Sequence, residues 1–294
     1  MNHQESFVSY LQYEKRCSSH TVTAYKNDLD QFLRYYAEMV GEFNVCAVDS
    51  KSIRGWVVTL MQNGINPSSV NRKVTSLKSF FRYLQKQKIV TENPVTAVPL
   101  PKKKRKLPGF VEENRLNQLL DNDFFSDDFI GTRNKLIITL FYGTGIRLSE
   151  LLGLKDTDID TTVSQIKVLG KRNKERIIPY PSNINLLLDE YWQKRRSLFG
   201  TNSECLLLTE KGAPVYAKLV YRVVKSELGK VTLLEKKSPH VLRHTYATHL
   251  MNHGADLNAV KELLGHANLA ATQIYTHTTF KKVHEIYKQA HPRG

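Results

Sequence analysis

Residues 238–250 read SPHVLRHTYATHL, and this stretch has the form of a helix that carries chemistry on one face. Ser238 followed by Pro239 is a typical helix start, because serine caps free N–H groups and proline fits the first turn. His240 and Arg243 are three residues apart, so they project from the same side of that helix. A guanidinium beside an imidazole indicates a site for an anion.

A second stretch, YGTGIRLSELLGL at residues 142–154, predicts another anion-binding helix start. Gly143 and Gly145 turn the chain, and Arg147 begins the next helix, where free N–H groups favour a negative ligand. Taken alone, Arg147 would be an ordinary surface charge. Because the forked donors of arginine match phosphate oxygens, Arg147 and Arg243 together suggest a clamp on a phosphodiester in its transition state.

The charge of the chain points to a polyanion as its partner. Lys and Arg number 43 against 28 Asp and Glu, a formal net charge of +15. An excess of this size favours nucleic acid over an anionic membrane surface, with a basic coat of ribosomal type as the alternative. Residues 1–106 hold 17 basic and 8 acidic side chains and residues 107–294 hold the other 26 and 20, so both halves are basic. The hydrophobic share of 41% excludes a mainly disordered or collagen-like chain.

A run of prolines and cations, PLPKKKRKLP at residues 99–108, marks the clearest boundary in the chain. Proline fixes an extended path, and the five consecutive cations repel one another out of a compact structure. We therefore expect a linker at residues 99–110 between a domain at 1–98 and a second domain at 111–294. The run can contact a nucleic-acid backbone, act as a nuclear localisation signal or be a plain solvated stretch.

Apolar residues recur at helical spacing before the linker and predict a bundle of four helices, at residues 6–13, 22–36, 53–61 and 66–84. The last helix starts at NPSS, a capping sequence with proline in the first turn. Away from its apolar stripe it carries a polar face, which suits contact with phosphates but also fits an ordinary solvated surface. The residues of this face are Ser69, Arg72, Lys73, Ser76 and Arg82.

The sequence after the linker mixes helical spacing with two β-prone runs. The runs at residues 164–169 and 176–179 flank the polar turn GKRNKE and predict a hairpin. The expected fold class is therefore mainly α with a small β-hairpin or sheet. The chain closes with an amphipathic helix at 279–290, whose apolar stripe can pack on its own domain or on a neighbouring protomer. The other helices are expected at 112–120, 134–142, 148–152, 183–198, 215–228, 239–252 and 256–264.

Neither a disulfide framework nor a metal centre is indicated. The cysteines, Cys17, Cys46 and Cys205, lie far apart and fit a reducing compartment. Five histidines fall within residues 240–266, but neither cysteine ligands nor the glutamate of a zincin helix accompanies them, so we expect no metal. Because we find neither a membrane-spanning apolar run nor a signal sequence, we expect a cytoplasmic protein.

Taken together, the motifs resemble the active site of the tyrosine recombinase (phage integrase) family. The similarity is strongest to the Xer recombinases (XerC/XerD type). Four stretches of sequence carry it: TGIRLSELLGL, SPHVLRHTYATHL, HGADLNAVKELLGHANLAATQIYTH and AHPRG. One departure is Arg172, where many relatives have glycine, so Lys171, Arg172 and Lys174 compete for the lysine position; alignment to the motif favours Lys171. The catalytic set implied by the resemblance is Arg147, Lys171, His240, Arg243, His266 and Tyr275.

The family chemistry implied by this resemblance is DNA strand transesterification without metal or cofactor. Tyr275 would attack the scissile phosphodiester and form a 3′-phosphotyrosyl bond, with His240 as the candidate base. Arg147 and Arg243 would neutralise the non-bridging oxygens, and His266 would add a hydrogen bond. The hairpin lysine would protonate the leaving 5′-oxygen.

The resemblance also implies the architecture and the partners. A SAM-like helical core-binding domain and a mixed α/β catalytic domain would form a C-shaped clamp on double-stranded DNA. The helix at 279–290 would dock in trans to make a homo- or hetero-tetramer, and a DNA translocase could serve as activator. The side chains expected to contact DNA are Arg72, Lys73, Arg82, Lys102, Lys103, Lys104, Arg105, Lys106 and Arg172.

Within the family, the leading interpretation is Xer-type resolution of chromosome dimers at a dif-like site, a step of chromosome partition and cell division. The protein would be bacterial, cytoplasmic and nucleoid-associated. The sequence shows no additional arm-binding domain of the kind found in lambda-like integrases, which favours a simple core-site recombinase. An integrase or invertase of a mobile element uses the same chemistry and is the main alternative. A non-catalytic DNA-binding regulator and a type IB topoisomerase are further alternatives.

Overall fold

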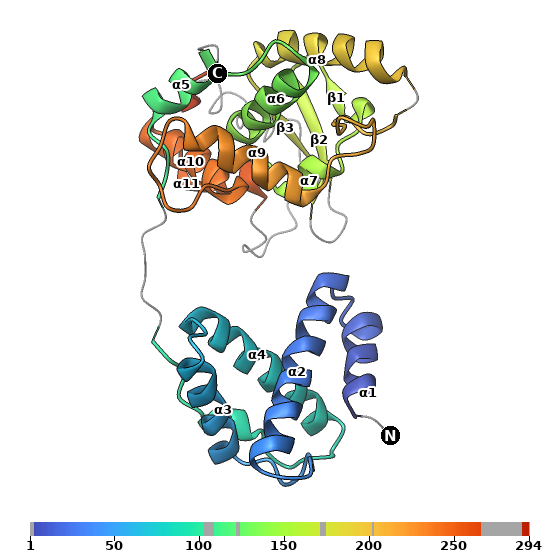
Figure 1. The fold of residues 1–294 in the computed structure, drawn as a ribbon, viewed down its shortest axis with the longest axis vertical. Helices are drawn as coiled ribbons and strands as arrows, with labels where there is room; N and C mark the ends of the chain where they lie inside the picture. Colours follow the sequence, from blue (N-terminus) through green and yellow to red (C-terminus); the bar gives the residue numbers. More distant parts are fainter. Residues whose placement is uncertain are drawn as a thin grey trace. The chain divides into compact units, whose positions relative to one another are not determined.

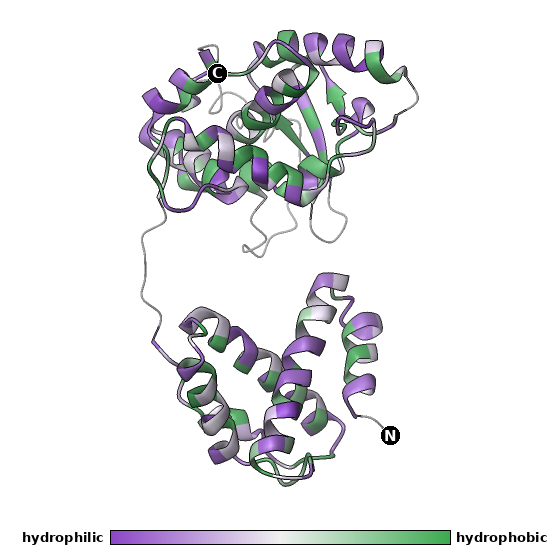
Figure 2. Ribbon diagram, viewed as in Figure 1, coloured by the Kyte–Doolittle hydropathy of each residue, from purple (hydrophilic) through white to green (hydrophobic). Residues whose placement is uncertain are grey.

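The computed structural model describes residues 3–102, 109–121, 124–170, 175–201, 203–265 and 290–293. The chain divides into two compact units, Met1–Lys106 and Leu107–Gly294 (Figure 1). Each unit has a hydrophobic core of its own. Figure 2 shows that the apolar residues of the helices follow stripes rather than covering whole surfaces, as the helical spacing predicts.

The first unit is a helical bundle of α1 (His3–Ser9), α2 (Ser19–Met39), α3 (Ser50–Gln62) and α4 (Pro67–Lys86). A π-helical turn, η1 (Tyr10–Glu14), extends α1, and a 3₁₀ turn, η2 (Pro94–Ala97), follows α4. Side chains cap three of the helices, because Ser18, Asp49 and Asn66 each accept a hydrogen bond from a backbone N–H in the first turn. Trp56 fills the core, with its ring centroid 5.1 Å from that of Phe32.

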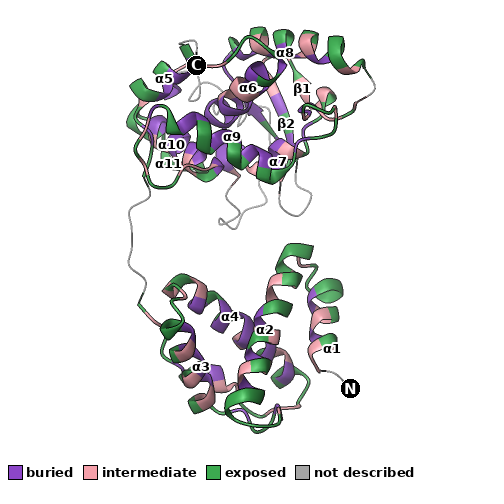
Figure 3. Ribbon diagram, in the orientation of Figure 1, coloured by how far each residue is buried: buried purple, intermediate pink, exposed green. Residues whose placement is uncertain are grey.

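The second unit consists mostly of helices and also contains a small sheet. Its helices are α5 (Glu113–Asp121), α6 (Phe129–Thr144), α7 (Leu148–Leu152), α8 (Ile184–Phe199), α9 (Ala217–Gly229), α10 (Pro239–Asn252) and α11 (Leu257–Leu264). Most residues of α6 are buried, and this helix packs against α8, α9 and α10 (Figure 3). A helix buried over most of its surface belongs in the centre of a fold, and α6 therefore anchors the elements around it.

The sheet is antiparallel with the order β1-β2-β3. Its strands are β1 (Ile159–Asp160), β2 (Gln165–Leu169) and β3 (Glu175–Pro179), and a 3₁₀ turn, η3 (Asp156–Asp158), precedes them. In the register, Ile166 pairs with Ile178 and Val168 with Arg176. The mainly α fold with a small hairpin is confirmed, and β1 adds a third short strand that the alternation pattern did not predict.

The last described residues pack against their own unit. Ala290 is buried in a cluster with Tyr246 and Leu264. His291 Nε2 lies 3.2 Å from the carbonyl oxygen of Tyr142, and Arg293 donates to Asp121 at 2.6 Å. Residues 279–289 of the expected C-terminal helix lie outside the described residues.

Candidate active site

Arg147 is positioned by a glycine turn and by the start of α7. Gly145 ends α6 with φ +60°, and a Cβ there would lie 2.4 Å from Tyr246 Cδ1, so only glycine fits. Arg147 is the residue that caps α7. Its backbone N–H donates to Glu150 Oε2 at 2.7 Å, and its guanidinium donates to Glu150 Oε1 at 2.8 Å and to the Gly265 carbonyl at 2.7 Å.

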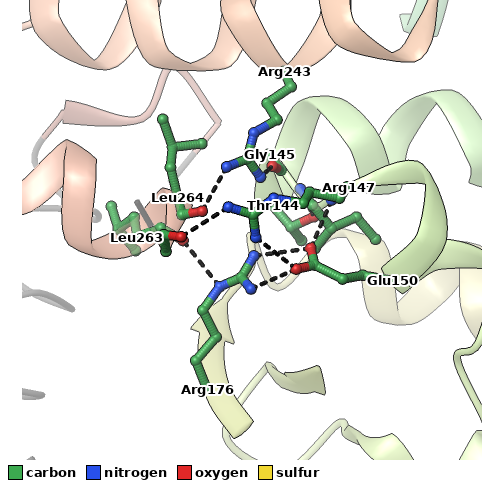
Figure 4. Close-up of polar contacts among 10 residues, drawn as sticks. Thr144, Gly145, Arg147, Glu150, Arg176, Arg243, Leu263 and Leu264 are labelled. Atoms are coloured by element: carbon green, nitrogen blue, oxygen red, sulfur yellow. Dashed lines mark hydrogen bonds and ion pairs between the residues drawn. The ribbon is translucent and has the colours of Figure 1, made fainter. Parts of the chain in front are cut away.

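Arg243 reaches the same place from α10. It is only 9% exposed, and its two Nη groups donate to the carbonyl oxygens of Gly145 and Leu264, both at 2.5 Å. Burial, and then the positive charge of Arg147, lower the pKa of Arg243 to about 10, so the guanidinium remains charged at neutral pH. Figure 4 shows both arginine side chains meeting between the turn after α6 and the end of α11.

A buried ion pair between Arg176 and Glu150 holds Arg147 in place. Arg176 on β3 binds both oxygens of Glu150, with Nη1–Oε1 at 2.6 Å and Nη2–Oε2 at 2.9 Å. Burial alone would raise the pKa of Glu150, but the hydrogen bonds from Arg176 and from the Arg147 N–H outweigh it and lower that pKa to about 2. Glu150 is therefore an anion shared by two guanidinium groups (Figure 4).

Sequence reasoning missed both members of this pair. One available signal was Glu150 at the third position of α7, where its carboxylate reaches back to the N–H of the capping residue. The other was Arg176 at a core-facing position of β3, between the exposed residues Glu175 and Ile177. A charged residue in the buried row of a strand needs a partner, although the sequence does not say which.

The remaining predicted catalytic residues are placed as follows. His240 is exposed on the first turn of α10, one turn before Arg243. Lys171, His266 and Tyr275 lie outside the described residues. In the sequence, Lys171 lies between the end of β2 and the start of β3, and His266 directly follows Gly265, whose carbonyl accepts a hydrogen bond from Arg147. The structure thus brings Arg147 and Arg243 together, with His240 on the same helix as Arg243.

The predicted DNA-binding face of α4 needs a correction. Lys73 is 8% exposed and donates to Asp28 Oδ1 at 3.1 Å, and buried Ser76 donates to the same carboxylate at 2.8 Å. Both point into the bundle because Asp28, buried on α2, requires polar partners there. Arg72 also binds Asp28, but half of its side chain is exposed, and Arg82 is exposed.

The linker contributes one described cation. Lys102 is exposed, directly after Pro101, whose carbonyl accepts a hydrogen bond from Asn71 Nδ2 at 3.1 Å. That bond fixes the beginning of the linker to α4. Lys103, Lys104, Arg105, Lys106 and Arg172 lie outside the described residues.

A basic face of α9 was not identified from the sequence. Lys218, Tyr221, Arg222 and Lys225 are exposed on this helix, whereas its acidic residue, Glu227, is buried. Their spacing of three to four residues was the available signal, since it places them on one side of a helix. Such a face suits contact with phosphates.

Two histidines, one in α10 and one directly after it, have separate partners. Buried His249 Nδ1 lies 2.9 Å from the hydroxyl of Tyr142, and His253 Nε2 lies 3.4 Å from the carboxylate of Glu113. Among the residues that the structure describes, no group of three His, Cys, Asp or Glu side chains could hold a metal ion. The three cysteines are free thiols. In the same part of the chain, each helix is too short or too polar to cross a membrane.

Family models match both units of the chain. Residues 5–88 match the N-terminal SAM-like domain of phage integrases, and residues 110–282 match the phage integrase family. The chain therefore belongs to the phage integrase family, the tyrosine recombinases.

Relatives at 37% and 38% identity agree with this assignment, and solved structures share the fold. The chain is 37% identical to the tyrosine recombinase XerC of Chlorobaculum tepidum over 98% of this chain and 94% of the relative. It is 38% identical to the XerC of Anoxybacillus flavithermus over 98% and 97% of the two chains. Its fold is similar to that of the Tn1549 transposon integrase in complex with circular intermediate DNA, with a TM-score of 0.72 and 20% identity over 96% of this chain and 99% of that one. The XerH recombinase bound to palindromic difH substrate gives a TM-score of 0.72 and 23% identity over 96% and 83%.

Proposed function

We propose that this protein is a Xer-type recombinase that resolves chromosome dimers at a dif-like site. The observation that carries the proposal is the convergence of Arg147 and Arg243 on one point. The similarity to XerC proteins over nearly the whole chain favours this role over that of a mobile-element integrase or invertase.

The two arginines are arranged to bind a phosphate. In the described part of the chain, each guanidinium uses two of its five N–H groups on internal acceptors: Glu150 and Gly265 for Arg147, Gly145 and Leu264 for Arg243. The other N–H groups remain for the non-bridging oxygens of the scissile phosphodiester. Because the internal bonds hold both groups before the substrate arrives, little reorganisation is needed in the transition state.

The proposed reaction is an exchange of phosphate esters. The Tyr275 oxygen forms a bond to phosphorus while the bond from phosphorus to the 5′-oxygen breaks. His240 takes the phenol proton, which is needed because a free tyrosine has a pKa of about 10. Lys171 gives a proton to the leaving 5′-oxygen, and His266 donates a hydrogen bond to the phosphate. The phosphotyrosyl ester conserves the bond energy, so a 5′-hydroxyl of another strand reverses the step.

The proposal includes partners beyond the single chain. Double-stranded DNA would contact Arg72, Arg82, the basic linker and the exposed face of α9. Four protomers, joined through the helix at 279–290, would hold two DNA sites, and a DNA translocase would activate the assembly. Such a protein would act in the cytoplasm, on the nucleoid.

Covalent trapping tests the chemistry. Nicked suicide duplexes carrying dif-like or element-end sequences are incubated in EDTA with the wild-type protein and with Tyr275→Phe. We expect an adduct that survives SDS with the wild type on the dif-like duplex and none with the variant. An adduct that persists in Tyr275→Phe contradicts the assigned nucleophile, and trapping on element ends alone would select the integrase role instead.

A further inference from the structure

Arg176 occupies an unusual place for a cation. It lies in the core-facing row of β3, paired across the strand with buried Val168, and is 9% exposed. A guanidinium in such a position costs folding free energy unless its N–H groups are paired. The groups that Arg176 binds therefore indicate its role.

The partners of Arg176 come from two other elements. Its Nη groups bind both oxygens of Glu150 on α7, and its Nε donates to the Leu263 carbonyl at the end of α11, 3.3 Å away. Gly265 makes room for this side chain, since a Cβ there would lie 3.2 Å from Arg176 Nη1 and 3.3 Å from its Cδ. Arg176 therefore joins β3, α7 and α11 (Figure 4).

Arg147 depends on a group that Arg176 binds, and Arg243 depends on the residue next to one that Arg176 binds. Arg147 is held by Glu150, the carboxylate that Arg176 binds through both oxygens. Arg243 is held by the Leu264 carbonyl, one residue beyond the carbonyl that accepts from Arg176 Nε. The fixed end of α11 also supplies the Gly265 carbonyl to Arg147.

We propose that Arg176 is a positioning residue for strand cleavage, which acts by holding Glu150 and the end of α11 so that Arg147 and Arg243 face the scissile phosphate. The proposal rests on the proposed function, because it concerns the same site. It assigns Arg176 no contact with DNA. A loss of Arg176 should therefore slow cleavage while leaving DNA affinity almost unchanged.

A buried arginine elsewhere in the same unit provides a matched control. Arg195 on α8 is 4% exposed, binds the carboxylate of Asp156 through both Nη groups and donates to the carbonyls of Cys205 and Leu206 at 3.0 and 2.8 Å. It has the same kind of partners as Arg176 but none of the site residues among them. Arg195→Met therefore reports what the loss of a buried ion pair alone does to activity.

The first test compares single-turnover formation of the covalent adduct on the nicked duplex for wild type, Arg176→Met and Arg195→Met, at a temperature where all three are folded. We expect Arg176→Met to slow cleavage by about 10²- to 10³-fold, the range for loss of a preorganised oxyanion contact. Affinity for the duplex should change less than about threefold in both variants, and Arg195→Met should cleave at nearly the wild-type rate. Equal cleavage rates for Arg176→Met and Arg195→Met would overturn the proposal.

A double variant tests whether Arg176 acts through Arg147. If it does, adding Arg176→Met to Arg147→Ala costs clearly less than Arg176→Met costs alone, because one of the two guanidinium groups that Arg176 positions is already gone. Losses that multiply in full would show that no part of the effect passes through Arg147 and would refute the positioning role. Arg176→Lys keeps the cation but loses the planar fork that binds both carboxylate oxygens side by side, so we expect at least a tenfold loss of cleavage rate.

The pH profile gives a signature that general destabilisation does not produce. Without Arg176, Glu150 keeps burial but loses its strongest ionic partner, so its pKa rises and cleavage by Arg176→Met should fall at a higher pH on the acid side than cleavage by wild type. An unshifted acid limb contradicts the proposal. Absence of any adduct with the wild-type protein would instead refute the proposed function, so the two failures are distinguishable.

Discussion

Replacement of Glu150 by glutamine should unfold the second unit at a markedly lower denaturant concentration. The substitution keeps the shape of the side chain and removes the charge that two guanidinium groups share. The pKa of Glu150, lowered from 4.5 to about 2, corresponds to about 3 kcal/mol in favour of the ionised carboxyl. The side chain is 2% exposed, so solvent screens this interaction little. The figure of about 3 kcal/mol agrees with the cost of removing one member of a buried ion pair, which is about 3–5 kcal/mol of folding stability.

The pH dependence of this effect follows from the direction of the shift. Because the folded pKa lies below the unfolded value, the stabilisation is fully present above about pH 4.5 and is lost as the pH falls toward 2. At neutral pH we expect a melting temperature lower by about 6–12 °C, from about 2–4 °C per kcal/mol in a domain of this size. The gap between wild type and Glu150→Gln should close as the pH falls below 4.5.

Tryptophan fluorescence isolates the unit in question. The chain has two tryptophans, Trp56 in the first unit and Trp192 in the second, so Trp56→Phe leaves a single reporter in the unit that holds the site. Urea unfolding in this background gives the midpoint with and without the Glu150→Gln substitution across the pH range. Glu204→Gln is the control, because Glu204 forms an exposed pair with Lys155 and its loss should leave the midpoint unchanged. Equal midpoints for Glu150→Gln and wild type at pH 7 would refute the reasoning.

Three other measurements test separate parts of the structure. Asp28→Ala should destabilise the first unit by about 3–5 kcal/mol in urea unfolding, because it leaves Lys73 buried without a carboxylate; an unchanged midpoint would contradict this. Burial lowers the pKa of His291 to about 4, so its imidazole is neutral in the folded protein at neutral pH. Below about pH 6.5 the unfolded chain binds a proton that the folded protein does not, and the folded state loses stability. Wild type should therefore lose about 2–3 kcal/mol relative to His291→Gln between pH 7 and 4.5, and parallel pH curves would show otherwise. Loss of Arg222 and Lys225 should reduce the slope of log affinity against log salt by about 2, measured by DNA binding, whereas an unchanged slope excludes phosphate contact by α9.

The helices and the hairpin were predictable because burial follows local periodicity. Val70, Val74 and Leu77 repeat at helical spacing and are buried as that spacing predicts. The polar side of the same helix was less predictable, since Lys73 and Ser76 face a carboxylate 45 or more residues away in the sequence. A hydrophobic pattern shows which face must be buried but not how far burial extends beyond it.

The residues of the site likewise divide into those with a local sequence signature and those without one. Arg147 and Arg243 could be proposed from their motifs because helix starts and residue spacing have local signatures. Glu150 and Arg176 are separated by 26 positions and meet only after β3 has packed beside α7. The sequence indicates that Arg176 needs a partner, but only the tertiary structure shows that the partner is Glu150. Hydrogen bonds to backbone carbonyls such as that of Leu264 leave no trace in side-chain identity at all.

The charge balance of this cluster indicates which state of the substrate it suits. Among the described residues, three guanidinium groups, those of Arg147, Arg176 and Arg243, face one carboxylate, that of Glu150, so two positive charges remain uncompensated. A phosphodiester in its ground state carries one negative charge, and attack by an oxygen nucleophile brings a second onto its non-bridging oxygens. Two fixed positive charges therefore complement the reacting phosphate better than the resting one. Interactions that strengthen only as charge develops are those that accelerate a reaction rather than merely tighten binding. Arg176 neutralises Glu150 through both oxygens, so the positive charges left for the substrate are those of Arg147 and Arg243. Hydrogen bonds to backbone carbonyls already hold these two guanidinium groups in place.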